Sequence, residues 1–388
     1  MGPLIERISI SIRINGTVQI NDKIYHLSKP KITDFFDEIR INLGSEKTYR
    51  PLLCGECSCH YTLHLKSGKV IEYSGNYALC DGTPYGCERY TIKIGLFSGD
   101  GDLMEKWEIP TNKTDNGKYI LTEIADFINR TIESKGIEKS DVIGVGLGVP
   151  GPVNKNGFVS VCVNLGWNSL NVEKEFHEIS GLPVKVGNDA NVAALGEMWQ
   201  GAGKGYQDVL MVTLGTGVGG GCVLNGQIVS GIHGAGGEIG HMPVKDDEKT
   251  PCNCGNHGCL EQYVSATGIV TQAKKLLDMD DCSSGLRDYD CLEAKHIYDE
   301  AKKGDVVANE LVDSTCKILA KALAQVCSVI DPKIIVIGGG VSKAGDILTS
   351  RISTFFKEYA FHACKNTPIV LAKLENDAGM YGCVKSLF

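Results

Sequence analysis

The chain has 388 residues, a length that predicts two or three domains. Its apolar fraction of 43% can supply hydrophobic cores, and its formal net charge of -8 argues against a general nucleic-acid binder, because clustered Lys and Arg hold phosphate backbones. The sequence has no apolar run of about 18 residues and no secretory signal pattern. We therefore expect a cytoplasmic protein without membrane or nucleic-acid partners, in which most of the 16 cysteines are reduced and buried.

Residues 1–87 are predicted to form a strand-rich extension of unknown role. Short strand-like runs alternate there with polar turns, and one helix signal covers 31–42. Cys54, Cys57 and Cys59, followed by His60, are compatible with a metal site. The more ordinary interpretation is a cysteine-rich turn, because the second ligand pair of a zinc ribbon is missing.

From residue 88 the pattern becomes strand, turn and helix in repetition, which is typical of an α/β protein with a largely parallel sheet. Strands are expected at 90–97, 103–109, 142–148, 182–186, 208–213 and 333–337, and helices at 119–134, 190–200, 264–277, 294–303 and 305–329. Glycines follow three of these strands, at Gly148, Gly215 and Gly338. Since ligands bind beyond the carboxyl ends of strands in such sheets, we expect these turns to meet at one cleft.

The strongest local signal is a run of metal-binding side chains. Three cysteines, Cys252, Cys254 and Cys259, stand close together, with His241 and His257 as competing fourth ligands. Thiolates and an imidazole separated by tight turns suit tetrahedral zinc, and metal binding would order a segment too small and polar to fold alone. Four protein ligands leave no position for a catalytic water, so the predicted zinc is structural. The alternative is a turn-rich loop with reduced cysteines.

Asp189 is the candidate catalytic group. It follows an apolar strand and precedes a helix, so its carboxylate should face a ligand in the cleft. The positive end of the helix dipole should favour the ionised form, which a general base requires. The alternative is that Asp189 only caps the helix, since Asp is a favoured N-cap residue.

Two glycine-rich turns are candidate phosphate-binding loops, because glycines let backbone N–H groups approach phosphate oxygens. They contain Gly215, Thr216, Gly217 and Gly219 in one loop, and Gly339 and Gly340 in the other. The alternatives are a tight hairpin and a plain strand-to-helix turn. Glu238 and Glu261, beside the cysteine run, could accept hydrogen bonds from sugar hydroxyls, or could be ordinary surface acids.

The order and spacing of these motifs resemble the ROK family of bacterial sugar kinases and related repressors, over about Thr91 to Phe388. The matching motifs are LGVPG at 147–151, NLGW at 164–167, NDAN at 188–191, GTGVGGG at 215–221, EIGH at 238–241, CNCGNHGCLE at 252–261 and GGGVS at 338–342. The zinc run flanked by these glutamates is the most specific of them. Within the family, the chain looks most like the glucokinases.

The resemblance implies a ribonuclease-H/actin-like fold of two α/β lobes, with the strand-rich extension added in front. The small lobe would comprise 88–190, completed by the C-terminal helix at 376–388, and the large lobe 191–375 with the zinc loop. It also implies a dimer or tetramer that phosphorylates the 6-hydroxyl of a hexose, glucose above all, with Mg²⁺-ATP.

The resemblance further assigns the site residues. Asp189 would be the general base, and the two glycine loops would hold ATP. His241, rather than His257, would complete the zinc site, and its second ring nitrogen would face the sugar. The residues implied to bind the sugar are Asn164, Asn188, Glu238, His241 and Glu261.

One departure from the family pattern concerns the nucleotide. Such kinases carry a first phosphate motif, Asp-x-Gly-Gly-Thr, which contacts the ATP phosphates and stands directly before the strand that begins here with Thr91-Ile92-Lys93. This chain has Gly86-Cys87-Glu88-Arg89-Tyr90 instead, and Asp81-Gly82-Thr83 is at most a displaced remnant. The alternative function is therefore a sugar-binding regulator or an inactive member with an impaired ATP site.

Overall fold

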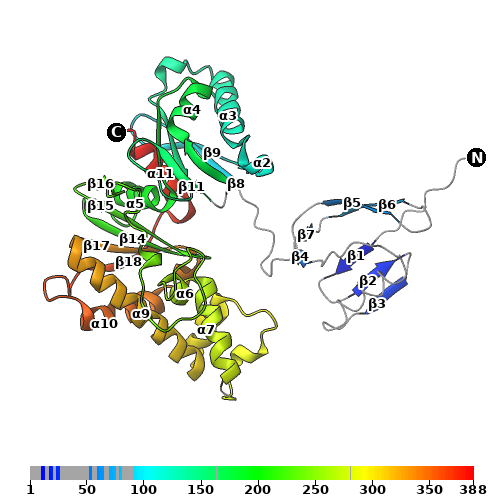
Figure 1. Ribbon diagram of the computed structural model, residues 1–388, viewed down its shortest axis with the longest axis vertical. Coiled ribbons are helices and arrows are strands. Elements are labelled where there is room, and N and C mark those ends of the chain that lie inside the picture. Colours follow the sequence, from blue (N-terminus) through cyan, green and yellow to red (C-terminus); the bar gives the residue numbers. More distant parts are fainter. Residues whose placement is uncertain are drawn as a thin grey trace, which may run out of the picture. The chain divides into compact units, whose positions relative to one another are not determined.

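The computed structural model describes residues 91–388, apart from Val163, Asn164 and Asp280, and the backbone of seven strands within the first 90 residues. The chain divides into two compact units, Met1–Tyr90 and Thr91–Phe388 (Figure 1). Among the described residues, no helix has both the length and the apolar character needed to cross a membrane.

The strands described in the first unit pair antiparallel throughout. They are β1 (Ile10–Arg13), β2 (Thr17–Ile20) and β3 (Lys23–His26) in one sheet, β4 (Leu52–Cys54) with β7 (Ala78–Cys80), and β5 (Cys59–His64) with β6 (Val70–Gly75). This agrees with the strand-rich character that the sequence predicts. The helix expected at 31–42, the side chains of the Cys54–Cys59 motif and His60, and the Asp81-Gly82-Thr83 run lie outside the described residues.

The second unit begins with three two-stranded sheets and the helices that cover them. The sheets pair β8 (Thr91–Phe97) with β9 (Leu103–Pro110), β10 (Val145–Val149) with β13 (Val184–Asn188), and β11 (Phe158–Cys162) with β12 (Trp167–Asn171). The helices are α2 (Thr114–Gly117), α3 (Ile120–Lys135), the 3-10 turn η1 (Lys139–Asp141) and α4 (Val172–Ser180). The buried residues Ile124, Val149 and Phe176 belong to one hydrophobic cluster, so these elements share a core.

A five-stranded sheet forms the centre of the rest of the unit, in the order β16-β15-β14-β17-β18. Its strands are β14 (Val209–Leu214), β15 (Val218–Leu224), β16 (Gln227–Ile228), β17 (Ile334–Gly338) and β18 (Ile369–Leu371). β14 runs parallel to β17, with Thr213 opposite Gly338. The glycine turns that follow these two strands therefore lie at the same end of the sheet, beyond the carboxyl ends of both strands.

Helices cover both faces of this sheet. This accounts for the nearly continuous apolar runs of its central strands, in which β17 is apolar throughout and β14 is apolar at every position except Thr213. The longer elements are α5 (Asp189–Gln200), α7 (Ala266–Met279), α8 (Ala294–Lys302), α9 (Val306–Ile330), α10 (Asp346–Tyr359) and α11 (Ala378–Lys385). The short ones are α6 (Glu261–Val264), η2 (Ile239–His241), η3 (Gly285–Asp288), η4 (Gly340–Ala344) and η5 (Glu375–Asp377).

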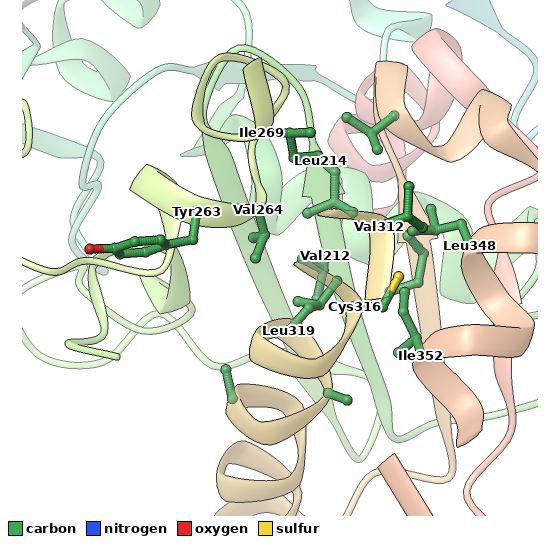
Figure 2. Packing of buried hydrophobic residues seen from close by; sticks show 14 of the residues in the cluster. Val212, Leu214, Tyr263, Val264, Ile269, Val312, Cys316, Leu319, Leu348 and Ile352 are labelled. Carbon is green, nitrogen blue, oxygen red and sulfur yellow. The ribbon is translucent and has the colours of Figure 1, made fainter. Parts of the chain in front are cut away.

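Side chains of β14 alternate between two hydrophobic clusters, as the period of two in a strand requires. Val209 and Met211 pack with α5 residues such as Leu195. Leu210, Val212 and Leu214 belong to the larger cluster on the other face. Figure 2 shows Val212 and Leu214 in that cluster beside residues of the helical layer, namely Val264, Ile269, Val312, Cys316, Leu319, Leu348 and Ile352.

The last helix, α11, packs against α5 and against β10. The approach to α5 is close because glycines lie at the contact: a Cβ on Gly382 would lie 1.6 Å from the Val192 carbonyl oxygen, and one on Gly196 would lie 2.0 Å from that of Ala378. On the other side, a Cβ on Gly146 of β10 would lie 2.1 Å from the carbonyl oxygen of Cys383. Helix α11 (red in Figure 1) thus joins the end of the chain to the part of the second unit that contains β10.

This contact predicts opposite effects for two glycines of one helix. Gly382→Ala should destabilise the protein by about 3 kcal/mol, because the added methyl group meets backbone that cannot move aside. Gly379→Ala is the matched control, since a Cβ there meets nothing within 4 Å, and helix propensity should make it neutral or stabilising by about 0.5–1 kcal/mol. Urea unfolding of both variants measures the difference, and equal stabilities would contradict the steric account.

Candidate active site

Asn188 and Asp189 lie at the junction of β13 and α5. Asn188 is the N-cap residue: its Oδ1 accepts a hydrogen bond from Asn191 N (3.1 Å), and its Nδ2 donates to Gly151 O (3.1 Å). The cap therefore fixes the turn between the strand and the helix. The alternative in which Asp189 is only the cap does not hold, because Asp189 is the first residue of the helix itself.

The Asp189 side chain combines access to solvent with a desolvated carboxyl group. The residue is exposed, yet surrounding protein raises the pKa of its carboxyl, chiefly by desolvation, while a hydrogen bond from Ala190 N (2.8 Å) acts in the opposite direction. The sequence predicts that the helix dipole favours the ionised form, whereas the pKa of Asp189 is raised, with desolvation as the largest cause. A carboxylate with a raised pKa is more basic, which suits a group that removes a proton.

Two glutamates and a histidine lie near Asp189. The pKa of Glu238 is raised overall. Desolvation is the largest cause and the charges of Asp189 and Glu261 add to it, whereas His241 acts in the opposite direction. Its Oε2 lies 4.0 Å from His241 Nε2. These four predicted side chains therefore share one electrostatic neighbourhood.

Glu261 is braced by the loop between β14 and β15. Its Oε2 accepts a hydrogen bond from Val218 N (2.9 Å), and its Oε1 lies 3.8 Å from Cys252 Sγ. A Cβ on Gly217 would lie 2.3 Å from Glu261 Oε2, so the close approach needs a glycine. Glu261 thus connects the first glycine loop to the cysteine run.

The cysteine run and His241 come together in space. The ligand atoms of His241, Cys252, Cys254 and Cys259 all lie within 4.8 Å of one another. Cys254 Sγ lies 3.7 Å from Cys259 Sγ, and Cys252 Sγ lies 3.7 Å from His241 Nδ1. Thiolates about 2.3 Å from a tetrahedral zinc ion would be about 3.8 Å apart, so the donor set and its spacing fit zinc.

The two glycine loops are adjacent. Gly339 has φ +83°, and a Cβ there would lie 2.5 Å from the carbonyl oxygen of Leu214. Gly215 O accepts a hydrogen bond from Ala266 N (2.8 Å), and Thr216 O accepts one from Thr267 Oγ1 (2.6 Å). The first loop is a hairpin turn that is hydrogen-bonded to the start of α7, and the second loop packs against this turn.

Comparisons with known proteins show the family. The pattern of the ROK family matches residues 88–386. The chain belongs to the ROK family. The glucokinase of Halalkalibacterium halodurans is 44% identical over 297 residues, which cover 75% of this chain and 90% of that protein. The crystal structure of a ROK family glucokinase from Streptomyces griseus, in complex with glucose and AMPPNP, has a TM-score of 0.59 and 32% identity, and covers 76% of this chain and 94% of that one.

The second unit accordingly has the ribonuclease-H/actin-like fold of ROK proteins, as the sequence predicts. A different kind of relative matches more of the chain. The xylose repressor of Caldicellulosiruptor bescii is 27% identical over 367 residues, which cover 93% of this chain and 89% of that protein. Such coverage exceeds what Thr91–Phe388 can supply, so this alignment extends into the first unit.

One predicted site residue is not placed by the structure, and one buried acid outside the site was missed by the sequence motifs. Asn164 lies outside the described residues. Glu197, which the sequence motifs do not single out, is completely buried in α5. A charged residue within the apolar stretch of a helix is the signal that could have drawn attention to it.

The raised pKa of Asp189 predicts how stability depends on pH. When a carboxyl group has a higher pKa in the folded than in the unfolded state, stability falls as the pH rises through the interval between the two values. Above that interval, ionised Asp189 costs stability, so Asp189→Asn should be at least as stable as wild type at pH 7. The advantage should vanish well below pH 4, where both side chains are neutral. Urea unfolding at several pH values measures the difference in stability between the variant and wild type. A variant that is less stable than wild type at pH 7 but equally stable at low pH would contradict the prediction.

Proposed function

We propose that the protein is a hexose kinase that transfers the γ-phosphoryl group of Mg²⁺-ATP to the 6-hydroxyl of glucose, giving glucose 6-phosphate and ADP. The observation that carries the proposal is the accessible, desolvated carboxyl of Asp189 beside Glu238, His241 and Glu261. The similarity to proteins named glucokinase favours glucose over other hexoses.

Asp189 is the group that takes the proton of the sugar hydroxyl. As the hydroxyl oxygen forms its bond to the γ-phosphorus, the bond to the β-phosphate oxygen breaks, and ADP leaves with that electron pair. Most of the rate enhancement in such a transfer comes from positioning and from neutralising the phosphate charges, the latter supplied by the Mg²⁺ that accompanies ATP. The protein's task is therefore to hold hydroxyl, carboxylate and phosphate in line.

The sugar hydroxyls bind Glu238, His241 and Glu261, with Asn188 and Asn164 completing the set. The side chains of Glu238 and His241 are each 34% exposed and can reach a ligand. Glu261 is already oriented by Val218 N. Carboxylates held in fixed orientations give directional recognition of hydroxyl groups.

A structural zinc ion is held by His241, Cys252, Cys254 and Cys259 in this proposal. Because His241 Nδ1 is the nitrogen that faces Cys252, a metal there leaves Nε2 to face the sugar. Ligating histidines are oriented by the bonds of their second nitrogen. The metal then determines the position of a sugar-binding side chain without taking part in the transfer.

ATP is assigned to the adjacent loops at Gly215, Thr216, Gly217 and Gly219 and at Gly339 and Gly340. The lobes are assigned as 88–190 with 376–388, and 191–375. The contacts of α11 with β10 support placing the end of the chain in the first lobe. Dimer or tetramer formation and a cytoplasmic location stay predictions.

A second candidate function is a sugar-responsive regulator without phosphoryl transfer. The alignment with a xylose repressor over 93% of the chain favours it, as does the departure from the first phosphate motif before Thr91. A coupled kinase assay with a panel of hexoses and N-acetylated hexosamines separates the two. Sugar binding without turnover of any sugar would favour the regulator.

Asp189→Ala should lower the turnover of glucose by about 10²- to 10⁴-fold, the range typical of a lost general base. Glucose affinity, measured by calorimetry, should change little, since the other sugar ligands remain. In the wild type, turnover should decline on the acid side of the raised pKa of Asp189, and the residual activity of the variant should lack that decline. Wild-type turnover in the variant would refute the assigned role.

Purified protein should contain one zinc ion per chain by elemental analysis. Removing it with a chelator, or replacing Cys254 with Ser, should lower the melting temperature and weaken glucose binding about tenfold or more, because His241 loses its anchor. Cys291→Ser is the control, since Cys291 is exposed and lies outside the ligand cluster. Metal-free protein with unchanged glucose affinity would contradict the zinc assignment.

A further inference from the structure

Glu197 is a charged residue in the interior that the proposed chemistry does not use. It lies in α5 and has 0% exposure. At 1.5 Å per residue, it is about 12 Å further along the helix than Asp189. A buried charge of this kind is costly unless hydrogen bonds compensate it, so its partners reveal its role.

The partners of Glu197 are backbone N–H groups from two segments, one directly after α5 and one 176 or 177 residues further along the chain. Oε2 accepts from Ala202 N (2.7 Å), just beyond the end of α5. Oε1 accepts from Leu374 N (2.7 Å), and the two oxygens share Lys373 N at 3.0 and 3.1 Å. A Cβ on Gly201 would lie 2.0 Å from Oε2, so a side chain at that position would displace the carboxylate.

The second unit has two α/β parts, one with the three two-stranded sheets and one with the five-stranded sheet. The two segments that bind Glu197 lie where the chain passes from one part to the other, and we call each such connection a passage. The first passage runs from β13 through α5 to the five-stranded sheet. The second runs from β18 through Lys373 and Leu374 to α11, which returns to β10. Glu197 ties one passage to the other beside the glycine contact between α5 and α11.

We infer that Glu197 is a positioning residue: its carboxylate locks the two passages together and so fixes the helix that carries Asp189 relative to the glycine loops of β14 and β17. The catalytic part of this inference rests on the proposed kinase function. A displacement of about 1 Å in a reacting group can lower the rate by about 10²-fold. A small rotation of α5 at its far end would displace Asp189 and lower the rate of phosphoryl transfer.

The chemistry of the contact requires a carboxylate. Both oxygens of Glu197 accept hydrogen bonds, and Ala202, Lys373 and Leu374 offer only N–H donors. In Glu197→Gln, an NH₂ group would replace one oxygen and would face a backbone donor. At least one buried N–H would lose its partner, which would weaken the hydrogen-bonded connection between the two passages.

The test compares Glu197→Gln with Glu300→Gln. Glu300 is also buried, with 8% exposure, but its partners are Tyr289 Oη and Lys303 Nζ, both at 2.8 Å and near its own helix α8. It therefore reports the general effect of neutralising an interior glutamate. Hydrogen exchange measured by mass spectrometry, glucose affinity and turnover number are determined for both variants.

In Glu197→Gln, exchange of the amides at 202, 373 and 374 should accelerate about tenfold or more, and turnover should fall about tenfold or more, while glucose affinity stays within about threefold. In Glu300→Gln, these amides and the turnover number should be unchanged at a comparable loss of melting temperature. Unchanged exchange at 373 and 374, or equal losses of turnover in both variants, would overturn the inference.

Two further outcomes are separable. If wild-type protein phosphorylates no hexose, the proposed function fails, and the exchange measurement still decides whether Glu197 locks the passages. If Glu197→Gln does not fold, Gly201→Ala perturbs the same contact from the other side. It should accelerate exchange at 373 and 374, and protection equal to wild type would overturn the inference.

Discussion

The close packing of α5 on α11 is the contact on which the rest of the second unit depends. At Gly196 and Gly382 the two helices approach so closely that backbone atoms occupy the space of a side chain. One helix lies on the five-stranded sheet and the other on β10, so this contact joins the two α/β parts. Because it is steric, it leaves little freedom in how those parts are arranged, and the positions of the site residues follow from it.

The candidate site draws its side chains from α5 and from the segment that contains the cysteines. Asp189 comes from the beginning of α5, whereas Glu238, His241 and Glu261 come from the segment ordered around the cysteines. Glu261 then binds the hairpin turn at Val218 N, and Gly339 packs against the same turn. The proposed sugar-binding residues and the two glycine loops are therefore connected by direct contacts, and a metal at the cysteines would stabilise more than its own loop.

Much of this could be predicted because the relevant signals are local. The apolar runs of β14 and β17 and the long α9 follow from periodicity, and each is found within a residue or two of the expected bounds. Spacing alone left His241 and His257 as competing ligands, and only the family resemblance favoured His241; the folded chain groups His241 with the three cysteines. Glu197 could not be assigned a role, because its partners Lys373 and Leu374 are 176 and 177 residues away in sequence.

The two acids of α5 show how backbone donors determine what a carboxylate can do. Glu197 has both oxygens occupied by N–H groups of Ala202, Lys373 and Leu374 and no exposed surface, so it is suited to holding the chain and not to meeting a ligand. Asp189 accepts from Ala190 in its own helical turn, keeps access to solvent, and has a raised pKa. Helix α5 thus carries the proposed catalytic acid at one end and, near the other, the buried acid that we infer to be its anchor, so a motion that loosens Glu197 would change where Asp189 points.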